Sequence, residues 1–271
     1  MVQSSSITAL IINIVICFGL PLGSLAYLLI KKKRAMIPFF AGMATFIVFQ
    51  LMLRVPLVNG LFASMDWYKH MTNNPLLYGL FLGLMAGLVE EGGRYCGYRA
   101  LLKERDRWID GFALGAGYGG IGAVVVGITY LSNLALILSI NNGDFAQLTA
   151  NLSADEANQI FTQLTALQPF DILLSGLERI FAFIIQIALS LLVLISVRKK
   201  KVLYLGAAVL THFLVDTVMY ILQYVLGFSM VLMIIYLGLM TAIAIVFMIR
   251  SRKAFEPIMP LSPSAAAQTQ A

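Results

Sequence analysis

The sequence predicts an all-α polytopic integral membrane protein with about seven transmembrane helices. Hydrophobic residues make up 60% of the 271-residue chain and charged residues only 12%, whereas soluble domains average about 25% charged residues. The apolar residues are concentrated in stretches of about 20 or more, the length that an α-helix needs to cross a bilayer. Most of the 19 Lys and Arg residues lie between or just after these stretches, in clusters at 31–34, 94–107, 198–201 and 250–253.

The positions of these clusters predict the orientation of the chain. Basic loops that alternate with loops poor in Lys and Arg are typical of the positive-inside pattern, in which the basic side is cytoplasmic. We therefore expect an N-out, C-in protein of a bacterial-type plasma membrane, with membrane lipids as partners. The net charge of +6 does not indicate nucleic-acid binding, because the basic residues flank apolar stretches. The sequence leaves the oligomeric state open.

The first two spans are expected at 7–30 and 36–58, on either side of the basic cluster 31–34. The N-terminus lacks the basic n-region of a cleavable signal peptide, so we expect the first span to be retained. The second span carries Arg54, which we expect to extend toward the outer interface. The segment 59–74 is expected to be an outer loop with aromatic residues at the interface.

The remaining five spans follow from the same pattern and complete a single transmembrane domain over residues 1–256. The segment 141–170 has no Lys or Arg and is expected to be an outer loop, in which Ser153 caps a short amphipathic helix. A tight turn near Gly227 separates the last two spans. The tail 257–271, rich in Pro, Ser, Ala and Gln, is expected to be disordered and cytoplasmic. The expected spans are 75–99, 109–140, 171–197, 202–226 and 230–249.

The third span carries charged residues within the membrane, in the stretch Glu90-Glu91-Gly92-Gly93-Arg94. A charge at bilayer depth costs roughly 2.5–3.5 kcal/mol on insertion scales, and such residues mark function by default. Helical spacing allows either carboxylate to pair with Arg94. An ion pair that only anchors the helix accounts for one carboxylate, whereas the second is available as an acid or base.

The fourth span is unusually rich in glycine around Tyr118. Glycines at 111, 115 and 119 share one face of a helix and favour close helix packing. Additional glycines at 117, 120 and 122 exceed what one packing face needs and suggest a thin or distorted helix beside a cavity.

The fifth and sixth spans contribute further polar residues. Glu178 and Arg179 are expected to pair, either to hold helices together or to support a site, and Gln186 follows two turns later. His212 and Asp216 share one face of the sixth helix, where a carboxylate can orient the imidazole ring.

Depth along the helices predicts that these spans face one polar pocket. At about 1.5 Å per residue, Tyr118 and His212 lie roughly 14–15 Å from a cytoplasmic helix start. Glu90 and Gln186 lie roughly 22 Å from their outer starts in a core about 30 Å thick. All four therefore fall at similar depth in the cytoplasmic half, so the third to sixth spans can share a pocket.

Four segments, at 90–95, 115–123, 178–190 and 212–216, resemble the YhfC family of glutamic-type intramembrane proteases, which is similar to the CAAX-protease and bacteriocin-processing group. The resemblance implies that Glu90 or Glu91 is the general base that activates water. It also implies that an arginine holds the other carboxylate and that polar groups bind the oxyanion. The resulting catalytic set is Glu90, Glu91, Arg94, Tyr118, His212 and Asp216, with Glu178, Arg179 and Gln186 as substrate-binding or supporting residues.

The chain differs from the family pattern at three polar positions, because Tyr118 and Gln186 stand where histidines are usual and Gly122 where a glutamate is usual. Beside an endopeptidase for membrane-embedded or membrane-proximal peptides, a catalytically silent adaptor that binds transmembrane or lipidated peptides therefore stays open. A transporter is a further alternative, although no inverted repeat is visible. We expect no cofactor and no metal, since zinc catalysis needs three protein ligands and His212 is the one histidine in a span.

Overall fold

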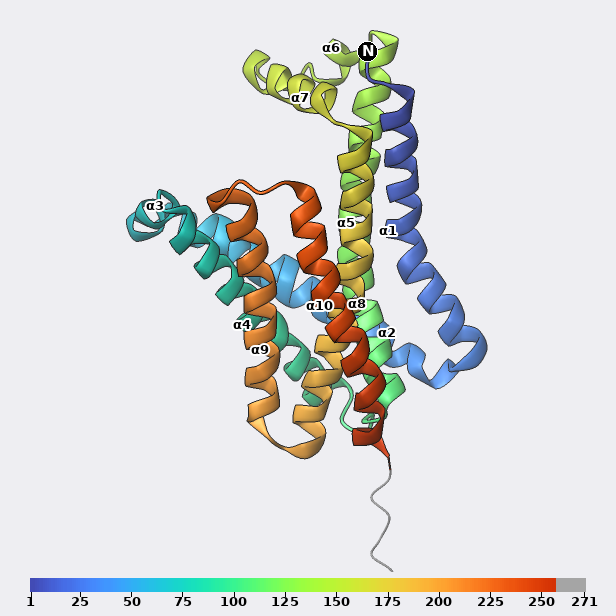
Figure 1. Ribbon diagram of the computed structural model, residues 1–271. Helices are drawn as coiled ribbons and strands as arrows, with labels where there is room; N and C mark the ends of the chain where they lie inside the picture. The colour runs from blue at the N-terminus through green and yellow to red at the C-terminus, as the bar shows by residue number, and fades with distance from the viewer. Residues whose placement is uncertain (257–271) are drawn as a thin grey trace, which may run out of the picture.

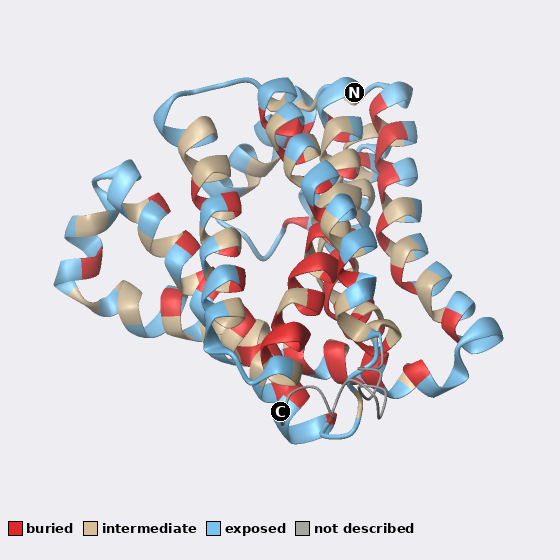
Figure 2. Cartoon of the chain, turned by 60° about the horizontal axis from the view of Figure 1, so that its bottom comes forward, coloured by how far each residue is buried: buried red, intermediate tan, exposed pale blue. Residues whose placement is uncertain are grey.

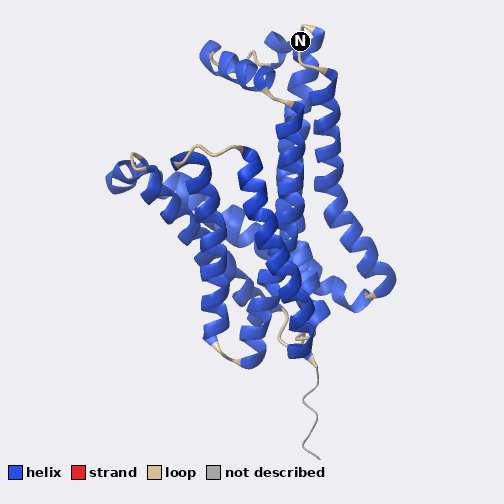
Figure 3. Cartoon of the chain, viewed as in Figure 1, coloured by secondary structure: helices blue, strands red, loops and turns tan. Residues whose placement is uncertain are grey.

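The structure is a computed structural model that describes residues 1–256, and within that range it contains helices and no strand (Figure 3). Seven helical segments among the described residues are long and apolar enough to cross a membrane. This confirms the all-α polytopic fold and the predicted number of spans. The tail expected to be disordered, 257–271, lies outside the described residues.

The spans lie close to their predicted positions, with the second as the exception (Figure 1). Three shorter helices lie outside the spans: α3 (Asp66–Thr72), α6 (Phe145–Leu148) and α7 (Ala154–Ala166). The spans are formed by α1 (Ser4–Lys31), α2 (Met36–Thr45) with its continuation, α4 (Pro75–Leu101), α5 (Trp108–Asn142), α8 (Pro169–Lys199), α9 (Val202–Tyr220) with its continuation, and α10 (Met230–Ser251).

The second span is longer and less regular than predicted. Beyond α2 it continues through π-helical turns, η2 (Phe46–Arg54) and η3 (Leu57–Leu61), and the helix reaches Ser64. The expectation of a loop over 59–74 is therefore wrong for most of its length, because the first part completes the span and α3 follows. Such π-helical turns are frequent at functional sites, and η2 faces the cavity described below.

The helix α8 is the centre of the bundle. In its most apolar stretch 61% of the residues are buried, against 17–39% in the other spans. Figure 2 shows the buried residues concentrated in the middle of the bundle and exposed residues on the outer faces of the peripheral helices. The outer faces carry exposed large apolar side chains, such as Val15 in α1 and Ile243 in α10, as expected for surfaces in contact with lipid.

The glycines of α5 bring helices together, and Gly119 and Gly122 also line the cavity described below. A Cβ atom added at Gly115 or Gly119 would lie 3.0 Å from a side-chain carbon of α8, as the predicted packing face requires. A Cβ atom added at Gly120 would lie 2.8 Å from Pro21 in α1, and Gly117 is pressed against Phe39 in α2. Gly117 and Gly120 therefore serve packing on other sides of an unbroken helix. The interpretation of a distorted helix is wrong, whereas the expected position beside a cavity is confirmed.

Apart from Arg94, which is buried inside the bundle, the four basic clusters gather at one end of the molecule. Arg105 donates a hydrogen bond to the carbonyl of Arg34, and Arg198 donates one to the carbonyl of Asp106 at 3.0 Å. Arg198 also reaches the carbonyl of Glu256 at 3.4 Å, while the N-terminus lies at the opposite end (Figure 1). This arrangement agrees with the charge pattern on which the predicted orientation rests.

The predicted helix cap in the loop between α5 and α8 is confirmed. The Ser153 hydroxyl accepts a hydrogen bond from the Glu156 amide at 3.3 Å, and the Glu156 carboxylate accepts one from the Ser153 amide at 2.9 Å. This capping box satisfies two backbone donors at the start of α7. Hydrogen bonds from Ser153 also hold the pKa of the Glu156 carboxyl below its usual range.

Candidate active site

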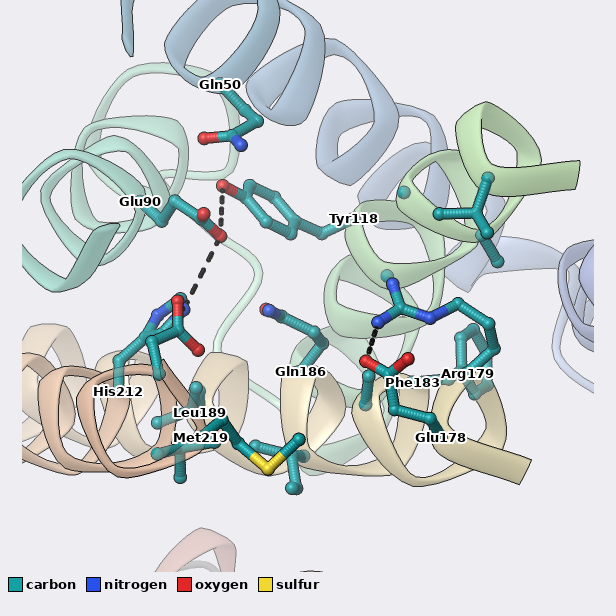
Figure 4. Close-up of a pocket in the computed structure, with 18 of the residues that line it drawn as sticks. Gln50, Glu90, Tyr118, Glu178, Arg179, Phe183, Gln186, Leu189, His212 and Met219 are labelled. Carbon is teal, nitrogen blue, oxygen red and sulfur yellow. Dashed lines mark hydrogen bonds and ion pairs between the residues drawn. The ribbon is translucent and has the colours of Figure 1, made fainter. Parts of the chain in front are cut away.

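A cavity of about 600 Å³ lies among the spans. The predicted polar residues of the third to sixth spans that line it are Asp216 and, as labelled in Figure 4, Glu90, Tyr118, Glu178, Arg179, Gln186 and His212. The structure thus brings the four spans to one pocket, as the depth comparison predicts. The second span also contributes to the lining, through η2.

The two adjacent glutamates have different surroundings. Glu90 lines the cavity, and its Oε2 atom accepts a hydrogen bond from the Tyr118 hydroxyl at 3.1 Å. Glu91 is completely buried behind the cavity wall. Its Oε1 atom contacts both the Arg94 guanidinium and His212 Nδ1. Glu90 therefore reaches the cavity and Glu91 does not.

His212 is held between carboxylates on both sides of its ring. Its Nδ1 atom lies 2.6 Å from Glu91 Oε1. Its Nε2 atom lies 3.9 Å from Glu90 Oε2 and 3.6 Å from Asp216 Oδ2. Asp216 was expected to orient the ring, but the residue that contacts Nδ1 is Glu91. Asp216 lies on the cavity side of the ring instead.

Arg94 connects three of the predicted site residues from a completely buried position. It pairs with Glu91, donates a hydrogen bond to the Gln186 side-chain carbonyl, and lies 3.9 Å above the centre of the Tyr118 ring. Because Arg94 binds the carbonyl of Gln186, the NH₂ group of that amide is left to face the cavity. The ring of Tyr118 and the side-chain carbonyl of Gln186 thus contact the same guanidinium.

Arg54 does not extend to the outer interface, and that expectation is wrong. Its guanidinium turns inward, 3.7 Å from Glu90 Oε1, and its side chain is only 17% exposed. Further contacts with the side chain of Gln50 at 3.2 Å and the carbonyl of Leu82 at 3.3 Å hold it there. Gln50 and Arg54 are four residues apart in the span, and this spacing indicates that they share a helix face but does not say which way that face points.

The pair Glu178–Arg179 forms within α8 and does not link helices. The two side chains contact each other, and the described residues provide neither with another salt-bridge or hydrogen-bond partner. Each side chain is 24% exposed and lines the cavity. Figure 4 shows the pair on the opposite side of Gln186 from His212.

Comparison with known proteins gives one consistent family. The family model described as YhfC intramembrane metalloprotease matches residues 16–237. The "Uncharacterized membrane protein YhfC" of Bacillus subtilis (strain 168) is 33% identical over 265 residues, which cover 94% of this chain and 100% of that protein. No solved structure matches the chain.

The family description implies a metal, and the described residues do not fit one. The described residues contain no group of three or more His, Cys, Asp or Glu side chains arranged to hold an ion, whereas catalytic zinc uses three protein ligands. Each oxygen of Glu90 also has a guanidinium nearby, Arg54 at 3.7 Å and Arg94 at 3.8 Å. A divalent cation bound to Glu90 would therefore lie beside two positive charges.

The family assignment rests on the extent of both matches. The family model covers most of the chain, including every predicted site residue, and the Bacillus relative aligns over its whole length. The seven apolar helices agree with a multi-pass membrane protein. The chain therefore belongs to the YhfC family of membrane proteins, whose family description is that of intramembrane proteases.

Proposed function

We propose that the protein is an intramembrane endopeptidase that cleaves membrane-embedded or membrane-proximal peptides with a water molecule activated by Glu90. The observation that carries this proposal is the position of Glu90 on the cavity wall opposite His212, with 3.9 Å between Oε2 and Nε2. A water molecule hydrogen-bonded to both atoms fits this separation. The family description supports the same class of reaction.

Glu91 sets the orientation of His212. A carboxylate only accepts hydrogen bonds, so Nδ1 of His212 donates its hydrogen to Glu91 across 2.6 Å. The Nε2 atom is then turned toward the cavity, between Glu90 and Asp216. Glu91 is thus a positioning residue, and Glu90 is the member of the pair that is left for the chemistry.

The cavity residues supply the groups that peptide hydrolysis needs. Glu90 takes a proton from water as the water oxygen attacks the carbonyl carbon of the scissile peptide bond. The oxyanion accepts hydrogen bonds from the amide of Gln186 and from protonated His212. The proton on Glu90 then passes to the leaving nitrogen as the C–N bond breaks, which gives one new carboxyl end and one new amino end.

Charge balance supports the presence of one proton in this group. The carboxylates and guanidinium groups around His212 are Glu90, Glu91, Asp216, Arg54 and Arg94. With every carboxylate ionised they leave one negative charge, and an uncompensated charge is costly at bilayer depth. One proton on His212 neutralises the group and supplies the donor that the oxyanion requires.

Cleavage of synthetic transmembrane peptides by the purified protein in liposomes tests the proposal. Wild type should cleave members of a peptide library, and Glu90→Gln should lower the rate by about 10²–10⁴, the contribution of a general base. His212→Ala should also lower the rate, because it removes an oxyanion donor. Asp171→Asn, a change on α8 outside the cavity lining, is the matched control and should leave the rate unchanged.

Two outcomes would contradict the proposal. Glu90→Gln could cleave as fast as wild type, which would exclude Glu90 as the base. Wild type could also bind peptides without cleaving any, while Tyr118→His, Gly122→Glu and Gln186→His together create activity. The protein would then be a silent peptide-binding member of its family.

A further inference from the structure

The cavity contains a second set of charged side chains that the proposed reaction does not use. Glu178 and Arg179 line the cavity from α8, each with 24% of its side chain exposed. Consecutive residues on a helix point about 100° apart and do not normally face each other. Both side chains nevertheless meet over the cavity, on the far side of Gln186 from His212 (Figure 4).

This ion pair has no structural partner in another helix. Within residues 1–256 each charged group has the other as its one hydrogen-bond or salt-bridge partner. The remaining N–H groups of Arg179 and the remaining oxygen sites of Glu178 therefore have no protein partner among the described residues, and both side chains line the cavity. Charged groups in a span are costly unless they serve a partner or a pathway, and helix–helix attachment does not account for this pair.

The distance from the pair to the reacting groups corresponds to a short peptide segment. Glu178 and Arg179 precede Gln186 by eight and seven residues in α8, which is about 11 Å along a helix that rises 1.5 Å per residue. An extended chain rises about 3.3 Å per residue. The pair is thus about three peptide residues away from a carbonyl bound at Gln186.

We propose that Glu178 and Arg179 form a subsite that binds the backbone of an unwound, extended substrate segment about three residues from the cleaved bond. This inference rests on the proposed peptidase function. A transmembrane helix must unwind locally to present a peptide bond, and each N–H and C=O group so released needs a partner in the membrane. Glu178 offers an acceptor for an N–H group, and Arg179 offers donors for a C=O group.

The zero net charge of the pair favours a peptide backbone, rather than a charged side chain, as its ligand. Glu178 and Arg179 together are neutral, so the pair does not favour a residue of either charge. It provides one acceptor and one donor side by side, which matches the neighbouring N–H and C=O groups of a peptide backbone. The subsite therefore selects for an unwound conformation more than for a particular side chain.

The experiment measures binding of fluorescent transmembrane peptides to the Glu90→Gln protein in liposomes, with one backbone amide N-methylated at a time. One position should lose about tenfold in affinity, the effect of one hydrogen bond to a charged group. That loss should disappear when Glu178→Gln is combined with Glu90→Gln, because the acceptor is weakened. Asp171→Asn in the same background is the matched control and should keep the loss.

The results separate this inference from the proposed function. Equal affinities for all N-methylated peptides, or a loss that persists with both Glu178→Gln and Arg179→Gln, would overturn the subsite even if wild type cleaves peptides. A sensitive position that depends on Glu178, in a protein that cleaves nothing, would support the subsite and contradict the peptidase. Melting temperatures of the variants within a few degrees of the parent show that the fold is retained.

Discussion

Replacing Glu91 by glutamine should destabilise the protein far more than the same replacement at the adjacent Glu90. Glu91 is completely buried, pairs with the completely buried Arg94, and contacts His212 Nδ1 at 2.6 Å. Breaking a buried ion pair by removing one partner costs about 3–5 kcal/mol, and Arg94 would keep only the more distant Glu90, at 3.8 Å, as a carboxylate partner. At about 2–4 °C per kcal/mol for a chain of this size, the melting temperature should fall by about 6–20 °C.

Glu90→Gln should be better tolerated by the fold. The two guanidinium groups lie 3.7 and 3.8 Å from Glu90, and the glutamine oxygen can still accept the hydrogen bond from Tyr118. The expected cost is about 1.5 kcal/mol, the lower end for a hydrogen bond to a charged group. Thermal unfolding of the purified variants in detergent, followed by tryptophan fluorescence, measures both effects. Equal losses at the two positions, or a larger loss at Glu90, would refute the assignment of Glu91 as the buried positioning residue.

Three further substitutions test the contacts around Glu90. Tyr118→Phe keeps the ring beneath Arg94 but removes the hydroxyl that binds Glu90, so the cleavage rate should fall about tenfold with little change in melting temperature; an unchanged rate would show that this hydrogen bond does not position the base. Gln186→Leu should lower kcat by about 10²–10³ through loss of an oxyanion donor, and a change confined to KM would contradict that role. Arg54→Gln should reduce the cleavage rate and Arg54→Lys should restore part of it, because a cation beside Glu90 Oε1 is retained; equal rates for the two variants would argue against an electrostatic role.

The helical spans could be predicted from sequence because apolar length alone defines them. Apolar length does not give the direction of a side chain within a span, as Arg54 shows. Its position along the second span was known, but the direction of its side chain depends on the π-helical turns of η2, which change the face on which each residue lies. A side chain of this length can extend to the interface or turn inward, and the contact with Glu90 in another helix decides between the two.

The candidate residues of the site could also be predicted from the sequence. Which of the two glutamates lines the cavity and which contacts His212 could not. The spacing of Glu90, Glu91 and Arg94 allows either carboxylate to pair with the arginine. The contact between Glu91 and His212 joins residues 121 positions apart in the chain, so it depends on how α4 packs against α9. That packing is close because glycines of α4 face α9: a Cβ atom added at Gly83 would lie 3.0 Å from the carbonyl oxygen of Phe213.

The most direct test of metal-independent, Glu90-dependent hydrolysis is the cleavage rate of the protein after treatment with a strong chelator, measured in parallel with Glu90→Gln. The arrangement of two guanidinium groups around Glu90 predicts that the chelated wild type keeps its full rate. It also predicts that Glu90→Gln is slower by about 10²–10⁴. Loss of activity on chelation that is restored by added zinc would contradict the account, as would an active Glu90→Gln protein.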